Sequence, residues 1–116
     1  MSNTRKQQDL RKLIGTLRTS PGVVVIGSQL TYNNHVYYFE GLLRGLMIST
    51  DHNFERQISK WYQKNAAIKA PNMIWFCQFD LIHKDKTEAQ KIKLLLDDLE
   101  LFFEEVGYDL LSDKKE

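Results

Sequence analysis

The chain has 116 residues, a mass of 13.6 kDa and a formal net charge of +1, and 42% of its residues are hydrophobic. These values are typical of one globular domain, which at this size buries about two-thirds of its unfolded surface. We expect a single domain over residues 1–116, with flexible ends at 1–4 and 112–116. The lone cysteine, Cys77, excludes an intramolecular disulfide and a cysteine-rich metal site.

The apolar segments of the chain are short. Residues 1–12 are polar and charged, unlike the apolar core of a secretion signal. The longest apolar runs, 73–77 and 42–48, fall far below the roughly 20 residues that span a bilayer. We therefore expect a cytoplasmic protein without a membrane partner.

The first third of the chain predicts a helix followed by a strand. Apolar residues repeat with the spacing of a one-sided helix between Leu10 and Leu17, and Asn3 or Thr4 is a suitable N-cap. The β-branched run 23–26, flanked by glycines, is typical of a buried strand.

The middle of the chain is ambiguous at first and then clearly helical. Residues 29–39 fit part of a hairpin, but Val36, Phe39 and Leu43 keep a helical period, which favours a helix over about 35–49.

A further helix is predicted directly after this segment. Asp51 is its expected N-cap, and its apolar stripe is formed by Phe54, Ile58, Trp61 and Tyr62.

The last third predicts a second strand and then a long helix. Residues 73–81 are mostly apolar and are typical of a buried strand. Thr87 and Gln90 match a capping box, an apolar face continues to Val106, and Gly107 suits the position after a helix end. The elements run α-β-α-α-β-α, so we expect an α/β or α+β fold with about four helices on a small sheet of two to four strands.

Candidate catalytic and metal-binding residues are sparse. His35, His52 and His83 have no partner at helical i+4 spacing, so no metal site is predicted. Asp80, His83 and Asp85 lie close in sequence, where a carboxylate could orient a histidine base, but a charged loop explains them more simply. We expect no catalytic residue, metal or cofactor, and a small enzyme using Asp80 and His83 is our third hypothesis.

Basic residues concentrate in the first part of the chain. Residues 1–69 hold ten Lys and Arg against four Asp and Glu, whereas residues 70–116 hold six against eleven. Cations near Trp61 and Tyr62 are compatible with nucleic-acid binding, in which basic groups contact phosphates and aromatic rings stack on bases. Both aromatic residues also fit an apolar core, so a small nucleic-acid-binding regulator is the alternative hypothesis. The basic residues concerned are Arg5, Lys6, Arg11, Lys12, Arg18, Arg56, Lys60 and Lys64.

The acidic face of the last helix is the most specific functional feature. Residues 97–116 contain eight acidic residues and two lysines. Leu94 and Leu101 fall among the acids and away from the core stripe, and Glu104 and Glu105 lie in the last turn, where the helix dipole disfavours negative charge. A solvated helix face is the simpler explanation, but carboxylates with interspersed leucines suit a basic, partly apolar partner. The predicted partner-binding residues are Leu94, Asp97, Asp98, Glu100, Leu101, Glu104 and Glu105.

In size, single-domain build, lack of a secretion signal and acidic C-terminal face, the chain resembles the small cytoplasmic immunity proteins of bacterial polymorphic toxin and contact-dependent growth inhibition systems. No motif defines that group, so the resemblance assigns no role to individual residues. It implies a non-enzymatic protein that binds a co-encoded toxin domain, often a nuclease, and protects the producing cell. We therefore expect an inhibitor that covers the basic active or substrate-binding surface of a cognate toxin.

Overall fold

The structure, a computed structural model, describes residues 5–19, 31–65 and 73–111, and every regular element in these ranges is helical. None of the described helices is long and apolar enough to cross a membrane. The elements are α1 (Arg5–Thr19), α2 (Tyr32–Thr50), α3 (Phe54–Asn65), α4 (Trp75–Ile82), α5 (Glu88–Phe102), the π-helical turn η2 (Phe103–Gly107) and α6 (Tyr108–Leu111).

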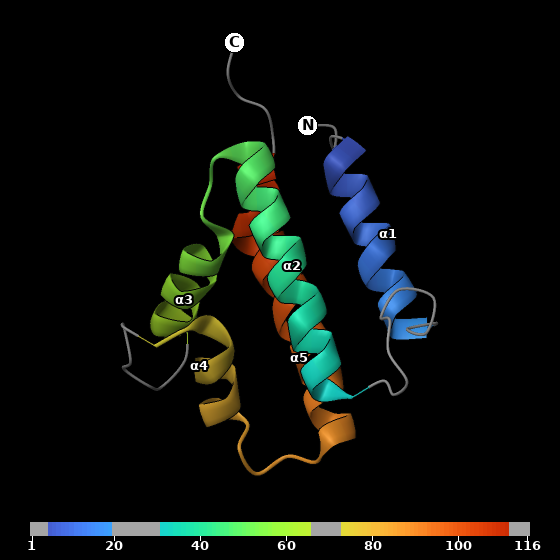
Figure 1. Ribbon diagram of the computed structural model, residues 1–116, viewed down its shortest axis with the longest axis vertical. Helices are drawn as coiled ribbons and strands as arrows, with labels where there is room; N and C mark the ends of the chain where they lie inside the picture. The colour runs from blue at the N-terminus through green and yellow to red at the C-terminus, as the bar shows by residue number, and fades with distance from the viewer. Residues whose placement is uncertain (1–4, 20–30, 66–72, 112–116) are drawn as a thin grey trace.

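Helix α5 forms the centre of the helical arrangement. Figure 1 shows α2 lying along α5, with α1 on one side of this pair and α3 and α4 on the other. Both α1 and α2 pack on α5, while α3 packs on α2 and on α4. The chain therefore buries the apolar stripes of its helices against one another around a shared core.

The expected α/β or α+β fold is wrong, because the described residues contain no strand. The segment predicted as a strand at 73–81 instead forms α4. Trp75, Gln78 and Phe79 are its buried residues, at i, i+3 and i+4, whereas Leu81 is exposed. A short apolar run fits a strand or a buried helix equally well, and burial here follows the helical period. The strand predicted at 23–26 lies outside the described residues.

The ambiguous segment before α3 is helical, as favoured from its periodicity. Helix α2 begins earlier than predicted, at Tyr32, because the side chain of Thr31 caps it by accepting a hydrogen bond from the Asn34 amide at 3.1 Å. Asp51 does not cap α3 as expected. It adopts a left-handed conformation (φ 65°) and ends α2, donating its amide to the Met47 carbonyl at 2.7 Å.

The predicted last helix is confirmed at its start and continues further at its end. The Thr87 hydroxyl accepts from the Gln90 amide at 3.2 Å, and the Gln90 side chain accepts from the Thr87 amide at 2.9 Å, which completes the capping box. Gly107 does not terminate the helix as expected, because η2 leads directly into α6. A Cβ atom at Gly107 would collide with the Phe103 ring, so this buried turn requires a glycine.

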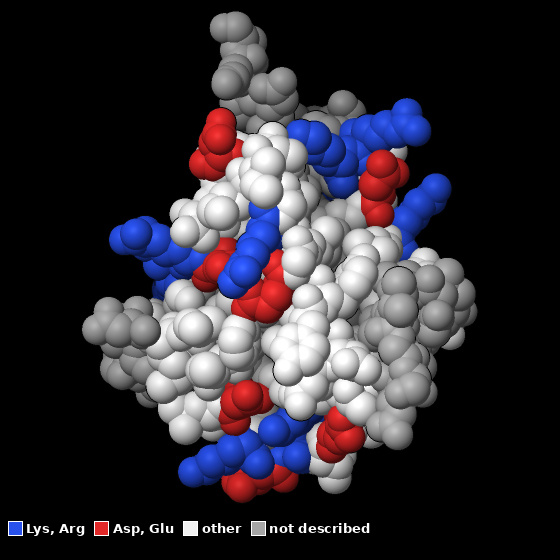
Figure 2. Space-filling view, in the orientation of Figure 1, with Lys and Arg blue, Asp and Glu red and all other residues white. Residues whose placement is uncertain are grey.

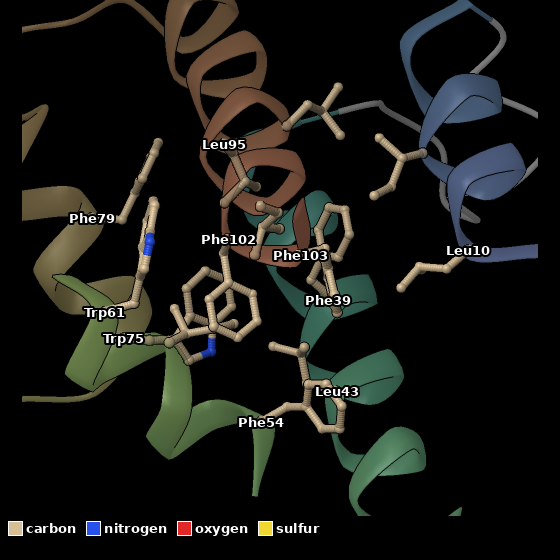
Figure 3. Packing of buried hydrophobic residues seen from close by; sticks show 14 of the residues in the cluster. Leu10, Phe39, Leu43, Phe54, Trp61, Trp75, Phe79, Leu95, Phe102 and Phe103 are labelled. Atoms are coloured by element: carbon tan, nitrogen blue, oxygen red, sulfur yellow. The ribbon is translucent and has the colours of Figure 1, made fainter. Parts of the chain in front are cut away.

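Aromatic residues from α2, α3, α4, α5 and η2 fill much of the core (Figure 3), and Tyr108 of α6 is buried as well. Phe102 and Phe103 are adjacent in sequence, yet both are fully buried, because successive helical residues point about 100° apart. The Phe102 ring meets Trp61 of α3 at 6.0 Å between centroids, and the Phe103 ring meets Phe54 at 6.1 Å. Burial of such a ring is worth about 2–3 kcal/mol, so these contacts fix α3 against the end of α5.

Candidate docking site on α5

The predicted acidic face, which runs along α5 and into η2, divides into two groups with different neighbours. The first group, Asp97, Glu100 and Glu104, faces α1. Arg18 donates to Asp97 at 2.8 Å and to Glu100 at 2.6 Å, and Arg11 donates to Glu104 at 3.2 and 3.3 Å. These ion pairs neutralise the three carboxylates within the protein and hold α1 on α5.

Asp97 shows most clearly that this group is internally paired. Burial opposes ionisation of its carboxyl, but hydrogen bonds from Lys93 and Arg18 prevail and lower the pKa of Asp97. On the face seen in Figure 2, where α2 lies in front of α5, basic and acidic side chains are mixed. Asp97, Glu100 and Glu104 of the predicted acidic face are paired with cations of the protein itself. The predicted face is therefore not a uniform strip of free carboxylates.

The second group, Asp98, Leu101 and Glu105, lines a pocket of about 310 Å³. Helices α3 and α4 form the remaining walls, so residues more than thirty positions apart in sequence meet here. The other lining residues are Trp61, Tyr62, Asn65, Ile82 and His83. A concave, mostly apolar site with a few convergent polar groups is the usual form of a binding pocket.

Asp98 is the more buried of the two carboxylates in this pocket, with 23% of its side chain exposed. The Tyr62 hydroxyl donates to its Oδ2 atom at 2.9 Å, and Nε2 of His83 lies 3.5 Å from the same oxygen. Burial raises the pKa of Asp98, although the hydrogen bond from Tyr62 and the nearby His83 act in the opposite direction. Burial and the charge of Asp98 also raise the pKa of Tyr62, which keeps the hydroxyl protonated as a donor.

The rim of the pocket combines an apolar and a charged residue. The Trp61 indole donates from Nε1 to Glu105 Oε1 at 2.8 Å, which holds this exposed carboxylate beside the opening. The side chain of Leu101 is 50% exposed, whereas Leu94 packs against the core. The prediction that both leucines lie away from the core is therefore correct for Leu101 and wrong for Leu94.

The residues of the enzyme hypothesis do not assemble as a group. Asp80 accepts a hydrogen bond from the Tyr32 hydroxyl at 2.6 Å and lies 3.9 Å from the Lys91 ammonium, whereas His83 pairs with Asp98. Asp85 is exposed in the turn after α4. In the described part of the chain, no three His, Cys, Asp or Glu side chains are grouped so that they could hold a metal ion.

The features behind the nucleic-acid hypothesis are also engaged in other contacts. Trp61 and Tyr62 are 8% and 3% exposed, which leaves little ring surface for stacking on bases. Arg11 and Arg18 pair with α5, and Arg5 lies 3.9 Å from Asp9. Three of the five cations on α1 are therefore paired, whereas Lys6, Lys12 and the three cations of α3 form no ion pair among the described residues.

Sequence reasoning missed the contribution of α3 and α4 to the pocket. Trp61 and Tyr62 were expected to be core residues and are buried, but each also donates a hydrogen bond to a carboxylate, Trp61 to one in η2 and Tyr62 to one on α5. No local pattern indicates these contacts, since the paired residues are 44 and 36 positions apart.

Sequence reasoning also missed a cluster of charges between α2 and α3. Arg44 lies 3.5 Å from Glu40 and 3.4 Å from Glu55. Burial and the adjacent Glu55 raise the pKa of Glu40 to about 7, although Arg44 opposes this shift. The i, i+4 spacing of Glu40 and Arg44 is the one local signal for this cluster.

Comparisons with known proteins give no relative from which a role could be transferred. No protein-family model matches the chain, and no match is found among curated proteins or solved structures. Any role of the pocket therefore has to follow from its own geometry and chemistry.

Proposed function

We propose that this protein is a non-enzymatic binding protein that neutralises a cognate toxic enzyme in the cytoplasm of the cell that makes it. The proposed target is a basic nuclease, whose active or substrate-binding surface the protein covers. The observation that supports this proposal is the convergence of Asp98, Leu101 and Glu105 at one pocket, since all three were predicted contacts.

The chemistry of this pocket suits a basic protein surface. A nuclease presents cationic side chains because its substrate is a polyanion, and carboxylates can occupy the positions of substrate phosphates. Leu101 offers exposed apolar area beside the two carboxylates. Apolar side chains that become buried on binding carry most of the affinity of an interface, while charge complementarity raises the association rate and the specificity.

The proposed contact surface is narrower than the sequence predicts. Asp97, Glu100 and Glu104 already have guanidinium partners on α1, and Leu94 is partly buried against the core. We therefore centre the interface on Asp98, Leu101 and Glu105.

A survival assay tests this proposal. The protein is co-expressed with the toxic C-terminal domain of a secreted protein encoded beside its gene, and colony survival is measured. We expect the wild-type chain to restore growth and Leu101→Lys to lose protection, because the new cation faces a basic surface. Ile48→Lys is the matched control, since Ile48 is a 79% exposed apolar residue on α2, outside the pocket.

Two results would contradict the proposal. Failure of the wild-type chain to restore growth would remove the neutralising function. Equal protection by Leu101→Lys and by Ile48→Lys would show that the interface lies elsewhere on the protein.

A further inference from the structure

The pocket beside Leu101 contains two carboxylates, those of Asp98 and Glu105. Among the described residues, neither carboxylate is paired with a lysine or an arginine. No lysine or arginine of the described ranges forms an ion pair within 4.0 Å of Asp98 or Glu105. The carboxylates that face α1 differ in this respect, because all three of them are paired with Arg11 or Arg18. The carboxylates of this pocket are therefore not paired with a Lys or Arg of the described residues, although Lys60 and Lys64 line a neighbouring hollow together with Glu105.

The hydrogen bonds within the pocket leave one oxygen of each carboxylate available. Tyr62 and His83 both approach Oδ2 of Asp98, and Trp61 donates to Oε1 of Glu105. Among the described residues, Oδ1 of Asp98 and Oε2 of Glu105 accept no hydrogen bond. The two carboxylates are thus held in place by neutral donors on α3 while each keeps an acceptor for a ligand.

We propose that this pocket receives an arginine side chain of the partner protein, an inference that rests on the function proposed above. A guanidinium group is planar and carries five donors, so it can donate to more than one acceptor oxygen in the same site. Trp61 and Tyr62, which are almost fully buried, form part of the pocket wall, and Ile82 and Leu101 offer apolar surface to the aliphatic stem. A lysine ammonium is a compact point charge without this planar set of donors, so we expect it to bind less well.

Binding of small arginine derivatives, measured by NMR on the intact protein, tests the inference without an identified partner. The probe is Nα-acetyl-arginine amide, compared with the amides of Nα-acetyl-citrulline and Nα-acetyl-lysine. Citrulline keeps the shape of arginine and lacks its charge. The reporter is the indole N–H resonance of Trp61, which lies in the pocket, and the control resonance is that of Trp75, which is fully buried in the core.

We expect the arginine amide to shift the Trp61 resonance saturably, with a dissociation constant of about 1–10 mM, which is usual for so small a ligand. The lysine amide is expected to bind about threefold more weakly and the citrulline amide about tenfold more weakly. The Trp75 resonance is expected to remain unchanged. An absent response, or equal responses to arginine and citrulline, would overturn the inference.

Substitutions locate the response in the pocket. Glu105→Gln removes the charge but keeps an acceptor for the Trp61 indole, and we expect about fivefold weaker arginine binding. Asp98→Asn is expected to act similarly, and the exposed Glu105 provides the test if that variant does not fold. Glu104→Gln is the matched control, because Glu104 pairs with Arg11 outside the pocket. Equal arginine binding by Glu105→Gln and wild type would also overturn the inference.

The results separate this inference from the proposed function. Protection in the survival assay without arginine binding would refute the arginine pocket and leave the neutralising function intact. Arginine binding without protection would refute the neutralising function and leave the pocket as a cation site.

Discussion

Replacement of Glu40 by glutamine tests the charge cluster between α2 and α3. The Glu40 side chain is 16% exposed, and burial together with Glu55 raises its pKa to about 7, from an ordinary value of 4.5. At about 1.4 kcal/mol per pH unit, this difference limits the effect on stability to about 3 kcal/mol. The Arg44 side chain is 67% exposed, so solvent screens the charges of the cluster. We therefore expect a smaller effect on stability, of about 1–2 kcal/mol.

The sign of the effect follows from proton linkage. Below pH 4.5 both the folded and the unfolded chain hold the Glu40 proton. Between pH 4.5 and about 7 the unfolded chain releases this proton while the folded chain retains it, so this group lowers the free energy of unfolding as the pH rises. Above about pH 7 the loss is complete and constant. Glutamine stays neutral, so Glu40→Gln should match wild type near pH 4.5 and exceed its stability by about 1–2 kcal/mol at higher pH.

Urea unfolding followed by helical circular dichroism at several pH values measures this difference. Glu55→Gln is a useful second variant, because removal of the neighbouring carboxylate should lower the pKa of Glu40 and flatten the same pH dependence. Asp9→Asn is the control, since Asp9 is exposed and lies on another helix. A difference between Glu40→Gln and wild type that does not change with pH would refute the reasoning.

Four further substitutions test the packing, one helix cap and the ion pairs of α1 by chemical unfolding. Gly107→Ala should destabilise the protein by about 1–3 kcal/mol, because its Cβ would collide with the Phe103 ring, whereas Gly41→Ala, with open space around it, should stabilise α2 by about 0.5–1 kcal/mol. Equal effects at the two glycines would contradict the packing of η2. Thr87→Ala should cost about 1 kcal/mol through loss of the capping box, and an unchanged unfolding midpoint would contradict that role. Arg18→Ala, which removes two ion pairs between α1 and α5, should cost about 0.5–1 kcal/mol at low salt and less at high salt; no dependence on salt would count against them.

Local patterns predicted most helices of this protein but gave the wrong fold class. The spacing of apolar residues correctly indicated α1, most of α2, α3 and α5, since each has a long one-sided stripe. Helix α4 has eight residues, and its apolar sequence does not distinguish a strand from a buried helix. Packing against α3 determines its structure, including the buried Gln78, which accepts a hydrogen bond from Gln63.

The candidate site could be predicted in part because charge and apolar spacing are local, whereas ion pairing depends on the fold. The positions of Asp98 and Leu101 on α5, and of Glu105 just beyond it in η2, follow from the predicted long helix. The pairing of Arg11 with Glu104 joins residues 93 positions apart, and it depends on how α1 packs on α5. Spacing along the chain therefore identified acidic residues but could not separate those already neutralised from those available to a partner.

Isothermal titration of the purified protein with the toxin domain encoded beside its gene is the most direct test of the proposed function and its location. We expect saturable binding of one protein per toxin domain, about tenfold or more weakened by Leu101→Lys and unchanged by Ile48→Lys. Absence of binding by the wild-type protein, or full affinity of Leu101→Lys, would contradict the proposed role of the α5 pocket.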